Sequence, residues 1–285
     1  MTQKEVFTIE EYPYSEEQMR KRLTTYLATP MPYMDEQTAY RFILNAIDLT
    51  TLEGSDNQQK ITDLCNKALN FYDVKRSIST TAAVCVYPPF VAQAKLLLKD
   101  TTVRVASVAG AFPAGQSPIE IKVAEVRYAV KEGADEIDMV ISRGKFLEGN
   151  YQAVYDEILA IRKACANARL KVILETGELM TAQNIYKASQ LAIAAGADFI
   201  KTSTGKISVN ATPEAFLVML DAIKRHYNRT GKIVGIKAAG SISDPETAMK
   251  YLNLAAQVLG QDWLTNRYFR IGASRLANKL FEKIK

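Results

Sequence analysis

The 285-residue sequence predicts an α/β fold in which eight parallel strands, each followed by a helix, close into a (β/α)8 barrel. Short apolar segments alternate eight times with longer helical patterns. The apolar segments are nearly continuous in hydrophobicity, as parallel strands are when helices cover the sheet. No Gly-x-Gly-x-x-Gly motif follows the first strand, which disfavours the doubly wound open sheet as the alternative.

Eight short segments, most of them rich in Val and Ile, are expected to form the strands. In chain order they lie around Asn45–Leu49, Ala82–Tyr87, Val103–Val108, Glu136–Ile141, Lys171–Thr176, Phe199–Ser203, Ile233–Lys237 and Phe269–Ala273. Their length and composition are typical of strands in a parallel sheet.

Helix start and stop signals separate these strands. Serines followed three residues later by Glu or Gln, as in a capping box, occur at Ser55 and Gln58, Ser117 and Glu120, and Ser243 and Glu246. Gly133 is expected to end the second of these helices. Another helix is expected from near Thr181 to Gly196, and Thr212, followed by a proline, begins a helix that Gly231 ends.

Residues 1–40 precede the first strand and are expected to form a short N-terminal helical extension. A helical pattern covers about Ser15–Leu27, and the turn-like segment Thr29–Pro32 follows it. Residues 41–285 are expected to form the (β/α)8 barrel as the catalytic domain. The extension is expected to pack on the barrel and not to form a separate domain.

Composition and charge exclude several classes of protein. No apolar run is long enough to span a membrane, and residues 1–5 lack the pattern of a signal peptide. The three cysteines are widely spaced and odd in number, which favours reduced thiols in the cytoplasm over a disulfide framework. The net charge of +5 suits a small anionic substrate, and no basic stripe indicates nucleic-acid binding.

The single histidine, His226, limits the chemistry that the chain could perform. It lies in a polar run that is typical of a solvated helix end. A histidine-based zinc site would need more than one such residue, and Ser–His or Cys–His catalysis would depend on this isolated side chain. We therefore expect no metal and no cofactor, and lysine and carboxylate chemistry remains.

Two lysines stand at the ends of consecutive predicted strands, Lys201 after Phe199 and Ile200, and Lys237 after Ile236. Burial disfavours an ammonium group, and two neighbouring ammonium groups also repel each other. The least unfavourable solution leaves one amine neutral. A neutral amine in a cleft is a nucleophile that forms Schiff bases with carbonyl compounds. In a barrel, both lysines would lie at the C-terminal ends of strands, where active sites are built.

Carboxylates are expected to share the barrel interior with these lysines. Glu136 and Asp138 lie two residues apart on the fourth predicted strand and therefore point to one face. Glu175 is expected on the fifth strand. Salt bridges that only fill the barrel are the structural alternative, but two lysines and several acids in one interior favour a catalytic site.

Motifs along the barrel carry a resemblance to a known family. They are Asp48-Leu49-Thr50-Thr51-Leu52, Val84-Cys85-Val86-Tyr87-Pro88, Ala134-Asp135-Glu136-Ile137-Asp138, Phe199-Ile200-Lys201-Thr202-Ser203-Thr204-Gly205, Gly235-Ile236-Lys237 and Phe269-Arg270-Ile271-Gly272-Ala273-Ser274. From about residue 40 to 280, their order and spacing resemble those of the 2-deoxy-D-ribose-5-phosphate aldolases, which are class I aldolases with a TIM barrel. The motif around Lys201 is the most specific of them.

The resemblance implies a reaction and named catalytic roles. The expected activity is the reversible cleavage of 2-deoxy-D-ribose 5-phosphate to D-glyceraldehyde 3-phosphate and acetaldehyde, a lyase step in deoxyribonucleoside catabolism. Lys201 would form the imine, and Lys237 would lower the pKa of Lys201 through its charge. Asp138 would act with a water molecule as general acid and base. The iminium group supplies the electrophile, so that no metal is implied.

The resemblance also implies substrate-binding residues. Asp48 and Thr51 match positions near the substrate hydroxyls, with a structural role equally open, and Cys85 matches a cysteine that lines the aldehyde pocket. Loops after the last three strands would hold the phosphate through backbone N–H groups, hydroxyls and charge. The residues expected in these loops are Thr204, Gly205, Lys206, Gly240, Ser241, Ser274 and Arg275.

The chain departs from the family pattern at three places. Residues 238–241 read Ala-Ala-Gly-Ser where a proline and paired glycines are usual. Arg275 stands where a second small hydroxyl residue is common, and could either contact the phosphate or point away from it. The chain ends at Glu282–Lys285, whereas some relatives have a longer tail. We expect phosphate binding to survive these changes.

Two alternatives to this function remain open at the level of sequence. One is another class I aldolase or transaldolase that acts on a different sugar phosphate, because the lysine pair would serve it equally. The other is a non-catalytic barrel that binds sugar phosphates. A phosphorylated sugar and an aldehyde are the expected partners, without nucleic acid or membrane, and a homodimer is a possible assembly.

Overall fold

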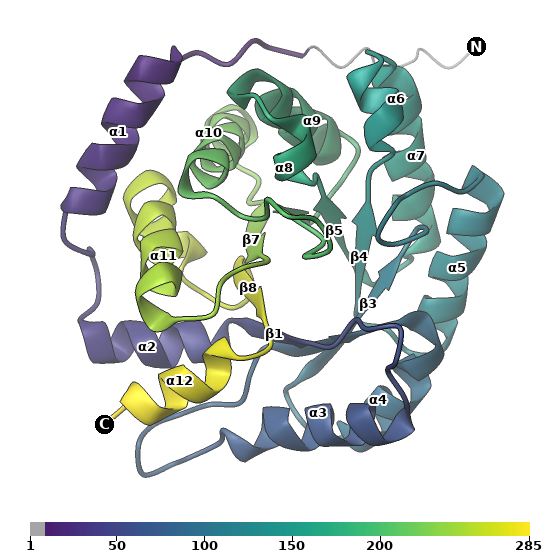
Figure 1. Ribbon diagram of the computed structural model, residues 1–285, viewed down its shortest axis with the longest axis vertical. Helices are drawn as coiled ribbons and strands as arrows, with labels where there is room; N and C mark the ends of the chain where they lie inside the picture. The colour runs from purple at the N-terminus through teal and green to yellow at the C-terminus, as the bar shows by residue number, and fades with distance from the viewer. Residues whose placement is uncertain (1–8) are drawn as a thin grey trace.

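The computed structural model describes residues 9–285 and confirms the predicted (β/α)8 barrel (Figure 1). All strands are parallel; each pairs with its neighbours in sequence, and β8 pairs with β1 to close the sheet. The strands are β1 (Ile47–Thr50), β2 (Ala83–Val86), β3 (Arg104–Ala109), β4 (Glu136–Val140), β5 (Arg169–Ile173), β6 (Phe199–Lys201), β7 (Gly235–Ala239) and β8 (Phe269–Ala273).

Helices surround the barrel as an outer ring (Figure 1). They are α1 (Glu16–Ala28), α2 (Glu36–Asn45), α3 (Gln58–Asn70), α4 (Val91–Leu97), α5 (Ile119–Lys131), α6 (Arg143–Leu147), α7 (Tyr151–Ala164), α8 (Thr176–Leu179), α9 (Ala182–Ala194), α10 (Pro213–Thr230), α11 (Pro245–Leu259) and α12 (Leu276–Lys283). Two 3₁₀ turns, Pro88–Phe90 and Gln261–Trp263, precede α4 and β8. None of the helices within residues 9–285 has the length and apolar character needed to cross a membrane.

Two helices begin at the predicted residues. The Thr212 side chain caps α10 by accepting a hydrogen bond from the backbone N–H of Ala215, and Gly231 ends that helix in the left-handed region at φ 68°. The Thr181 side chain caps α9 in the same way, and Gly196 follows that helix at φ 92°. Local side-chain chemistry therefore fixes the bounds of these two helices.

The three predicted capping serines are wrong. Asn57, and not Ser55, caps α3, while Asp244, and not Ser243, caps α11; each side chain accepts from the backbone N–H three residues later. Asn and Asp cap as well as serine, and here they lie nearer to the helix. No side chain caps α5, so Ser117 does not do so either.

Side chains alternate along each strand between two very different environments. One face of the strands packs into the apolar core beneath the helices, through Leu49, Val84, Val105, Ile137, Val172, Ile200, Ile236 and Ile271. The opposite face points into the barrel, where β1 and β4 to β8 carry charged side chains. The register places Lys201 directly opposite Lys237, and Asp138 opposite Lys171.

The N-terminal segment contains the predicted helix, α1, which packs against α10 and α11. Arg22 of α1 donates two hydrogen bonds of 2.7 Å to the Asp221 carboxylate on α10, and the hydroxyl of Tyr12 donates a third of 2.8 Å. This charged network attaches the extension to the barrel. The predicted boundary between residues 40 and 41 falls inside α2, and the division into two domains stays a prediction.

Candidate active site

The barrel interior contains a cluster of three acidic and four basic side chains. None of them is more than 3% exposed. They are Asp48 on β1, Glu136 and Asp138 on β4, Lys171 on β5, Lys201 on β6, Lys237 on β7 and Arg270 on β8. We call this set the ionic cluster.

Asp138 lies at the centre of the ionic cluster. Its Oδ2 lies 2.8 Å from Nζ of Lys201 and 2.8 Å from Nζ of Lys237. Its Oδ1 lies 2.8 Å from Nζ of Lys171. One carboxylate thus holds the amines of three consecutive strands, and the two predicted lysines meet at a single oxygen.

The other two acids hold the remaining cations. Asp48 lies 2.5 Å from Nζ of Lys237 and 2.5 Å from a guanidinium nitrogen of Arg270. Glu136 lies 2.5 Å from Nζ of Lys171 and 2.8 Å from the other terminal nitrogen of Arg270. Lys237, Lys171 and Arg270 therefore each have at least two carboxylate partners, whereas Lys201 has only Asp138 among the described residues.

The three lysines differ in pKa for this reason. Burial lowers the pKa of Lys201; Asp138 opposes the shift, the charge of Lys237 reinforces it, and the net direction is downward. Burial also disfavours the charged forms of Lys171 and Lys237, but their carboxylate partners outweigh it and raise the pKa of both. The same lysines outweigh the burial of Asp138 and hold its pKa well below its usual range.

The count of charges points to the same lysine. When all seven groups of the ionic cluster are ionised, four positive charges face three negative charges. When Lys201 is neutral, the two signs balance. An uncompensated buried charge is unfavourable, so that the cluster favours the neutral amine at the residue with the fewest partners.

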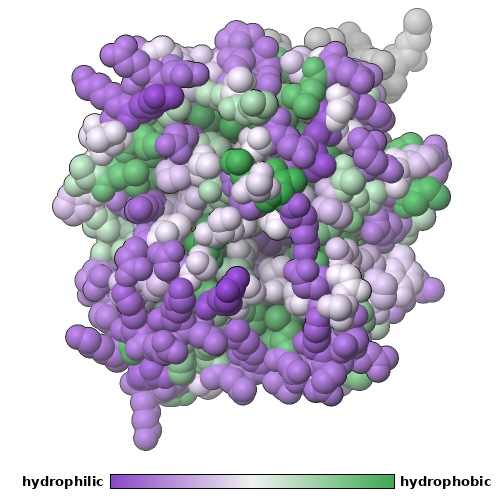
Figure 2. All heavy atoms as spheres, in the orientation of Figure 1, coloured by the Kyte–Doolittle hydropathy of each residue, from purple (hydrophilic) through white to green (hydrophobic). Residues whose placement is uncertain are grey.

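A cavity of about 350 Å³ opens above the ionic cluster. Within the described residues, Lys201 is the one member of the cluster that lines it. Its walls come from the ends of β1, β7 and β8 and from the loops that follow β1, β6, β7 and β8: Thr50, Thr51, Leu52, Glu53, Thr204, Gly205, Lys206, Ala239, Gly240, Ser241, Ile242, Ser243, Gly272, Ala273, Ser274 and Arg275. Figure 2 shows the same face as Figure 1, largely hydrophilic at its rim and hollowed near its centre.

Most of the residues expected to bind substrate line this cavity. They are Thr51, Thr204, Gly205, Lys206, Gly240, Ser241, Ser274 and Arg275. The structure thus brings together the predicted residues of four separate loops beside Lys201. Their roles in binding stay predictions.

Asp48 and Cys85 lie outside the cavity lining. Asp48 is fully buried within the ionic cluster, which favours the structural role that the sequence left open. Cys85 is also fully buried, and packs in a small apolar group with Leu52, Ala106 and Val108. Burial raises the pKa of the Cys85 thiol to about 11, so that it is not ionised at neutral pH.

The sequence predicted Glu175 on the fifth strand, and this prediction is wrong, because β5 ends at Ile173. Glu175 follows β5 in the left-handed region at φ 58°, and its carboxylate points to the loop after β6 and not to the lysines. Its two oxygens accept hydrogen bonds from the backbone N–H of Thr204 at 3.1 Å and from the hydroxyl of Thr204 at 2.5 Å. Burial raises the pKa of Glu175. Glu175 thus fixes a loop that forms one wall of the cavity.

Ser241, which replaces a usual glycine, is held by a residue that sequence reasoning missed. Its backbone is left-handed at φ 61°, a conformation that favours glycine. The Asn210 side chain donates a hydrogen bond of 3.3 Å to the Ser241 hydroxyl oxygen. The preceding residue must be glycine, because a Cβ on Gly240, at φ 83°, would lie 2.4 Å from Oδ1 of Asn210.

Two members of the ionic cluster, Lys171 and Arg270, were also missed. Both occur in the quoted strand segments, as single charged residues between apolar neighbours. A charge inside a continuous apolar strand is the signal that could have identified them, because such a side chain needs buried partners.

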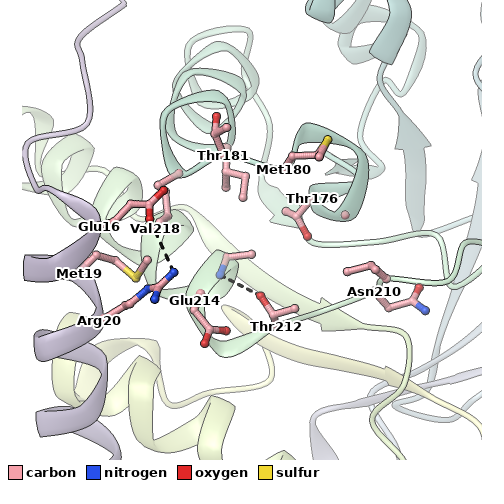
Figure 3. Close-up of a pocket in the computed structure, with 15 residues that line it drawn as sticks. Glu16, Met19, Arg20, Thr176, Met180, Thr181, Asn210, Thr212, Glu214 and Val218 are labelled. Carbon is pink, nitrogen blue, oxygen red and sulfur yellow. Dashed lines mark hydrogen bonds and ion pairs between the residues drawn. The ribbon is translucent and has the colours of Figure 1, made fainter.

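A second cavity, of about 610 Å³, is lined by residues outside the ionic cluster (Figure 3). Glu16, Met19 and Arg20 of α1 form one side of it, and the starts of α9 and α10 form the other. None of the predicted site residues lines this cavity. Its larger size therefore does not make it the candidate active site.

Within residues 9–285, no group of three or more His, Cys, Asp or Glu side chains is arranged to hold a metal ion. The three acids of the ionic cluster lie close together, but lysines and Arg270 occupy their oxygens.

Comparisons with known proteins find a family model, curated sequences and solved structures that are similar to this chain. Residues 42–262 match the DeoC/LacD family of aldolases. The deoxyribose-phosphate aldolase of Homo sapiens is 48% identical over 251 residues, which cover 84% of this chain and 78% of that protein. The Mus musculus enzyme is 47% identical over 248 residues, with 84% and 78% covered. The Aeropyrum pernix deoxyribose phosphate aldolase, described as a tetramer, has a similar fold, with a TM-score of 0.69 at 24% identity over 94% of this chain and 97% of that chain.

Proposed function

Because this chain belongs to the DeoC/LacD family of aldolases, we propose that Lys201 forms the imine through which it cleaves 2-deoxy-D-ribose 5-phosphate. The chain is a class I aldolase, and its reversible reaction yields D-glyceraldehyde 3-phosphate and acetaldehyde. One observation carries the choice of lysine: of the ionic cluster's members in the described chain, Lys201 alone lines the cavity. Its lowered pKa supports the same choice.

The first half of the reaction joins substrate and enzyme. The neutral Lys201 amine adds to C1 of the open-chain aldehyde and gives a carbinolamine. A proton delivered through Asp138 and a water molecule lets the C1 hydroxyl leave as water, so that a protonated imine remains. Asp138 is placed for this exchange, since its Oδ2 lies 2.8 Å from Nζ of Lys201.

The second half breaks the carbon–carbon bond. Removal of the C3 hydroxyl proton turns C3 into the aldehyde carbon of glyceraldehyde 3-phosphate. The electrons of the C2–C3 bond move toward C1 and the iminium nitrogen, which gives the enamine. Protonation of C2 and addition of water at C1 then release acetaldehyde and restore the amine. Asp138 and water relay these protons.

Lys237 and Lys171 keep Asp138 ionised and in place. Both remain charged, because their carboxylate partners raise their pKa. The charge of Lys237 also helps to lower the pKa of Lys201. Glu136 pairs with Lys171, and Asp48 pairs with Lys237. Arg270 in turn holds both acids, so that the whole cluster positions one reactive amine.

The cavity walls are suited to the phosphate end of the substrate. Lys206 and Arg275 supply positive charge, while Ser241 and Ser274 supply hydroxyls. Gly205 and Gly240 follow β6 and β7, where backbone N–H groups approach a ligand closely. We assign phosphate binding to this side of the cavity, beyond Lys201.

Assembly and location are part of the same proposal. A homodimer and a cytoplasmic location both suit an enzyme of nucleoside catabolism with reduced, buried cysteines. Size-exclusion chromatography with light scattering would measure the assembly, and fractionation of the source cells would locate the protein.

Borohydride reduction in the presence of 2-deoxyribose 5-phosphate, followed by peptide mass spectrometry, tests the proposal. A reduced adduct on Lys201 is the expected result. An adduct on Lys237 would keep the imine chemistry but reverse the two lysine roles. Absence of any adduct from an active protein would contradict the imine mechanism.

A further inference from the structure

Glu53 is the one acidic side chain among the described residues that line the active-site cavity. The cavity has three basic side chains, Lys201, Lys206 and Arg275. A carboxylate in the wall of a cavity weakens the binding of a phosphate dianion there, because like charges repel. The position of Glu53 therefore needs an explanation.

The Glu53 carboxylate is bound to the lysine assigned to phosphate. Its Oε1 lies 2.9 Å from Nζ of Lys206. Glu53 follows β1 and Lys206 follows β6, and these strands are not neighbours in the barrel. The bridge thus joins two residues of the cavity wall from separate loops, and a carboxylate oxygen already occupies the ammonium group of Lys206.

The backbone of Glu53 is fixed independently of its carboxylate. Its N–H donates a 3.0 Å hydrogen bond to Oδ2 of Asp56, and its carbonyl accepts one of 3.0 Å from the Asp56 N–H. The hydroxyl of Thr51 holds the other Asp56 oxygen at 2.9 Å. The Glu53 side chain itself is 66% exposed. Its carboxylate can leave Lys206 without disturbing the turn.

Phosphate is the stronger partner for Lys206. An exposed carboxylate–ammonium pair contributes little free energy, whereas a phosphate dianion forms stronger charge-assisted hydrogen bonds. A phosphorylated ligand therefore displaces Glu53, but it must break the bridge and then lies near the displaced negative charge. Both effects lower the affinity of the cavity for phosphate.

We propose that Glu53 is a specificity-determining residue that competes with the substrate phosphate for Lys206. The inference rests on the phosphate site of the proposed function. Substrate and D-glyceraldehyde 3-phosphate both carry the phosphate group, so that the competition weakens the binding of both. The competition lowers the affinity for phosphorylated ligands and thereby speeds the release of D-glyceraldehyde 3-phosphate.

Inorganic phosphate tests the inference directly, through calorimetric titration and through inhibition of 2-deoxyribose 5-phosphate cleavage. The variant Glu53→Gln removes the charge and keeps the size of the side chain. Its matched control is Glu246→Gln. Glu246 on α11 is also exposed and paired with a lysine, Lys283 on α12, at 2.6 Å, and neither residue lines the cavity. Both variants change the net charge equally.

In Glu53→Gln, we expect phosphate to bind about threefold or more tightly, the scale of one exposed ion pair. The preference for 2-deoxyribose 5-phosphate over 2-deoxyribose, as a ratio of kcat/KM values, should rise with it. Glu246→Gln should change neither quantity. In a Lys206→Gln background, the effect of Glu53→Gln should shrink, because the contested cation is absent.

Three outcomes would overturn the inference. Unchanged or weaker phosphate binding in Glu53→Gln, while the wild type cleaves the substrate, would refute it alone. An equal gain in Glu246→Gln would assign the effect to net charge. A wild type that neither binds phosphate nor cleaves 2-deoxyribose 5-phosphate would refute the phosphate site of the proposed function as well.

Discussion

Two groups of buried ions in this barrel use lysine in different ways. Between α5 and α7, Nζ of the fully buried Lys122 lies 2.8 Å from Oε2 of Glu157 and 2.9 Å from the hydroxyl of Ser142. Glu157 also accepts hydrogen bonds from the N–H and hydroxyl of Ser142. This group has one positive and one negative charge. In the ionic cluster, by contrast, Lys201 adds a fourth cation to three acids. Its one carboxylate partner within residues 9–285, Asp138, is shared with two other lysines.

The difference shows that burial alone does not make a lysine reactive. Lys122 has a carboxylate of its own and does not line the active-site cavity. Lys201 shares its carboxylate partner with other lysines and lines the cavity, and its pKa is lowered. The number of carboxylates available to each amine, together with access to a ligand, separates a structural lysine from a chemical one. Substitutions of equal size in the two groups can test this distinction.

Lys201→Met should have the largest effect on activity and little effect on stability. The variant has no amine for the imine, so that kcat for 2-deoxyribose 5-phosphate should fall by at least about 10⁴-fold. Borohydride should no longer trap an adduct. The remaining six charges of the ionic cluster balance, so that the melting temperature should not fall. A loss of melting temperature comparable with that of Lys122→Met would contradict the charge-balance argument.

Lys122→Met should show the opposite behaviour. It leaves the buried Glu157 carboxylate without its cation, and breaking such a pair costs about 3–5 kcal/mol of unfolding free energy. For a chain of this size the melting temperature should fall by about 10 °C. Differential scanning calorimetry measures this change, with kcat of the folded variant as control. The double variant Lys122→Met/Glu157→Leu should recover much of the loss, and failure to do so would mean that the pair is not the cause.

Lys237→Leu should separate two effects of the Lys237 charge, which lowers the pKa of Lys201 and holds Asp138 and Asp48 in place. Loss of the Lys237 charge removes one influence that lowers the pKa of Lys201, so that the pKa of Lys201 should rise. The reactive form of Lys201 is the neutral amine, and a higher pKa leaves less of it at pH 7. We expect kcat to fall by about 10²-fold at neutral pH and to recover partly as the pH rises.

The pH dependence of kcat/KM checks this prediction for Lys237→Leu. The acidic limb of the profile should move to higher pH than in the wild type. Arg229→Leu is a suitable control, because Arg229 is an exposed cation far from the barrel interior, paired with Glu10. An acidic limb that did not move would show that Lys237 acts only by holding Asp138 and Asp48 in place.

The sequence predicted the barrel and the lysine pair for different reasons. Parallel strands covered by helices leave a continuous apolar pattern, and a lysine that ends such a strand is visible without any structure. The other two cations of the cluster were less accessible. Lys171 meets Glu136 and Asp138, and Arg270 meets Asp48 and Glu136, only after the barrel closes. Ser55 and Ser243 were wrong as caps because each helix begins later, after Asn57 or Asp244, whose own side chain caps it. The position of Glu175 depends on one left-handed residue, which the pattern of the strand does not reveal.

Glu175→Gln should have the smallest effect, and it tests a buried carboxylate that serves no lysine. Glu175 holds the loop after β6 through Thr204, and Arg143 lies 3.4 Å from its second oxygen. A glutamine can accept only one of the two hydrogen bonds from Thr204, because its amide nitrogen donates. The loop should loosen while Lys201 stays in place.

We expect KM for 2-deoxyribose 5-phosphate to rise about threefold to tenfold in Glu175→Gln, with kcat changed less than about twofold. The same variant assayed with 2-deoxyribose, which lacks the phosphate, should show a smaller rise in KM. An equal rise for both sugars, or a fall in kcat like that of Lys237→Leu, would place Glu175 with the chemistry of the ionic cluster and not with the phosphate wall.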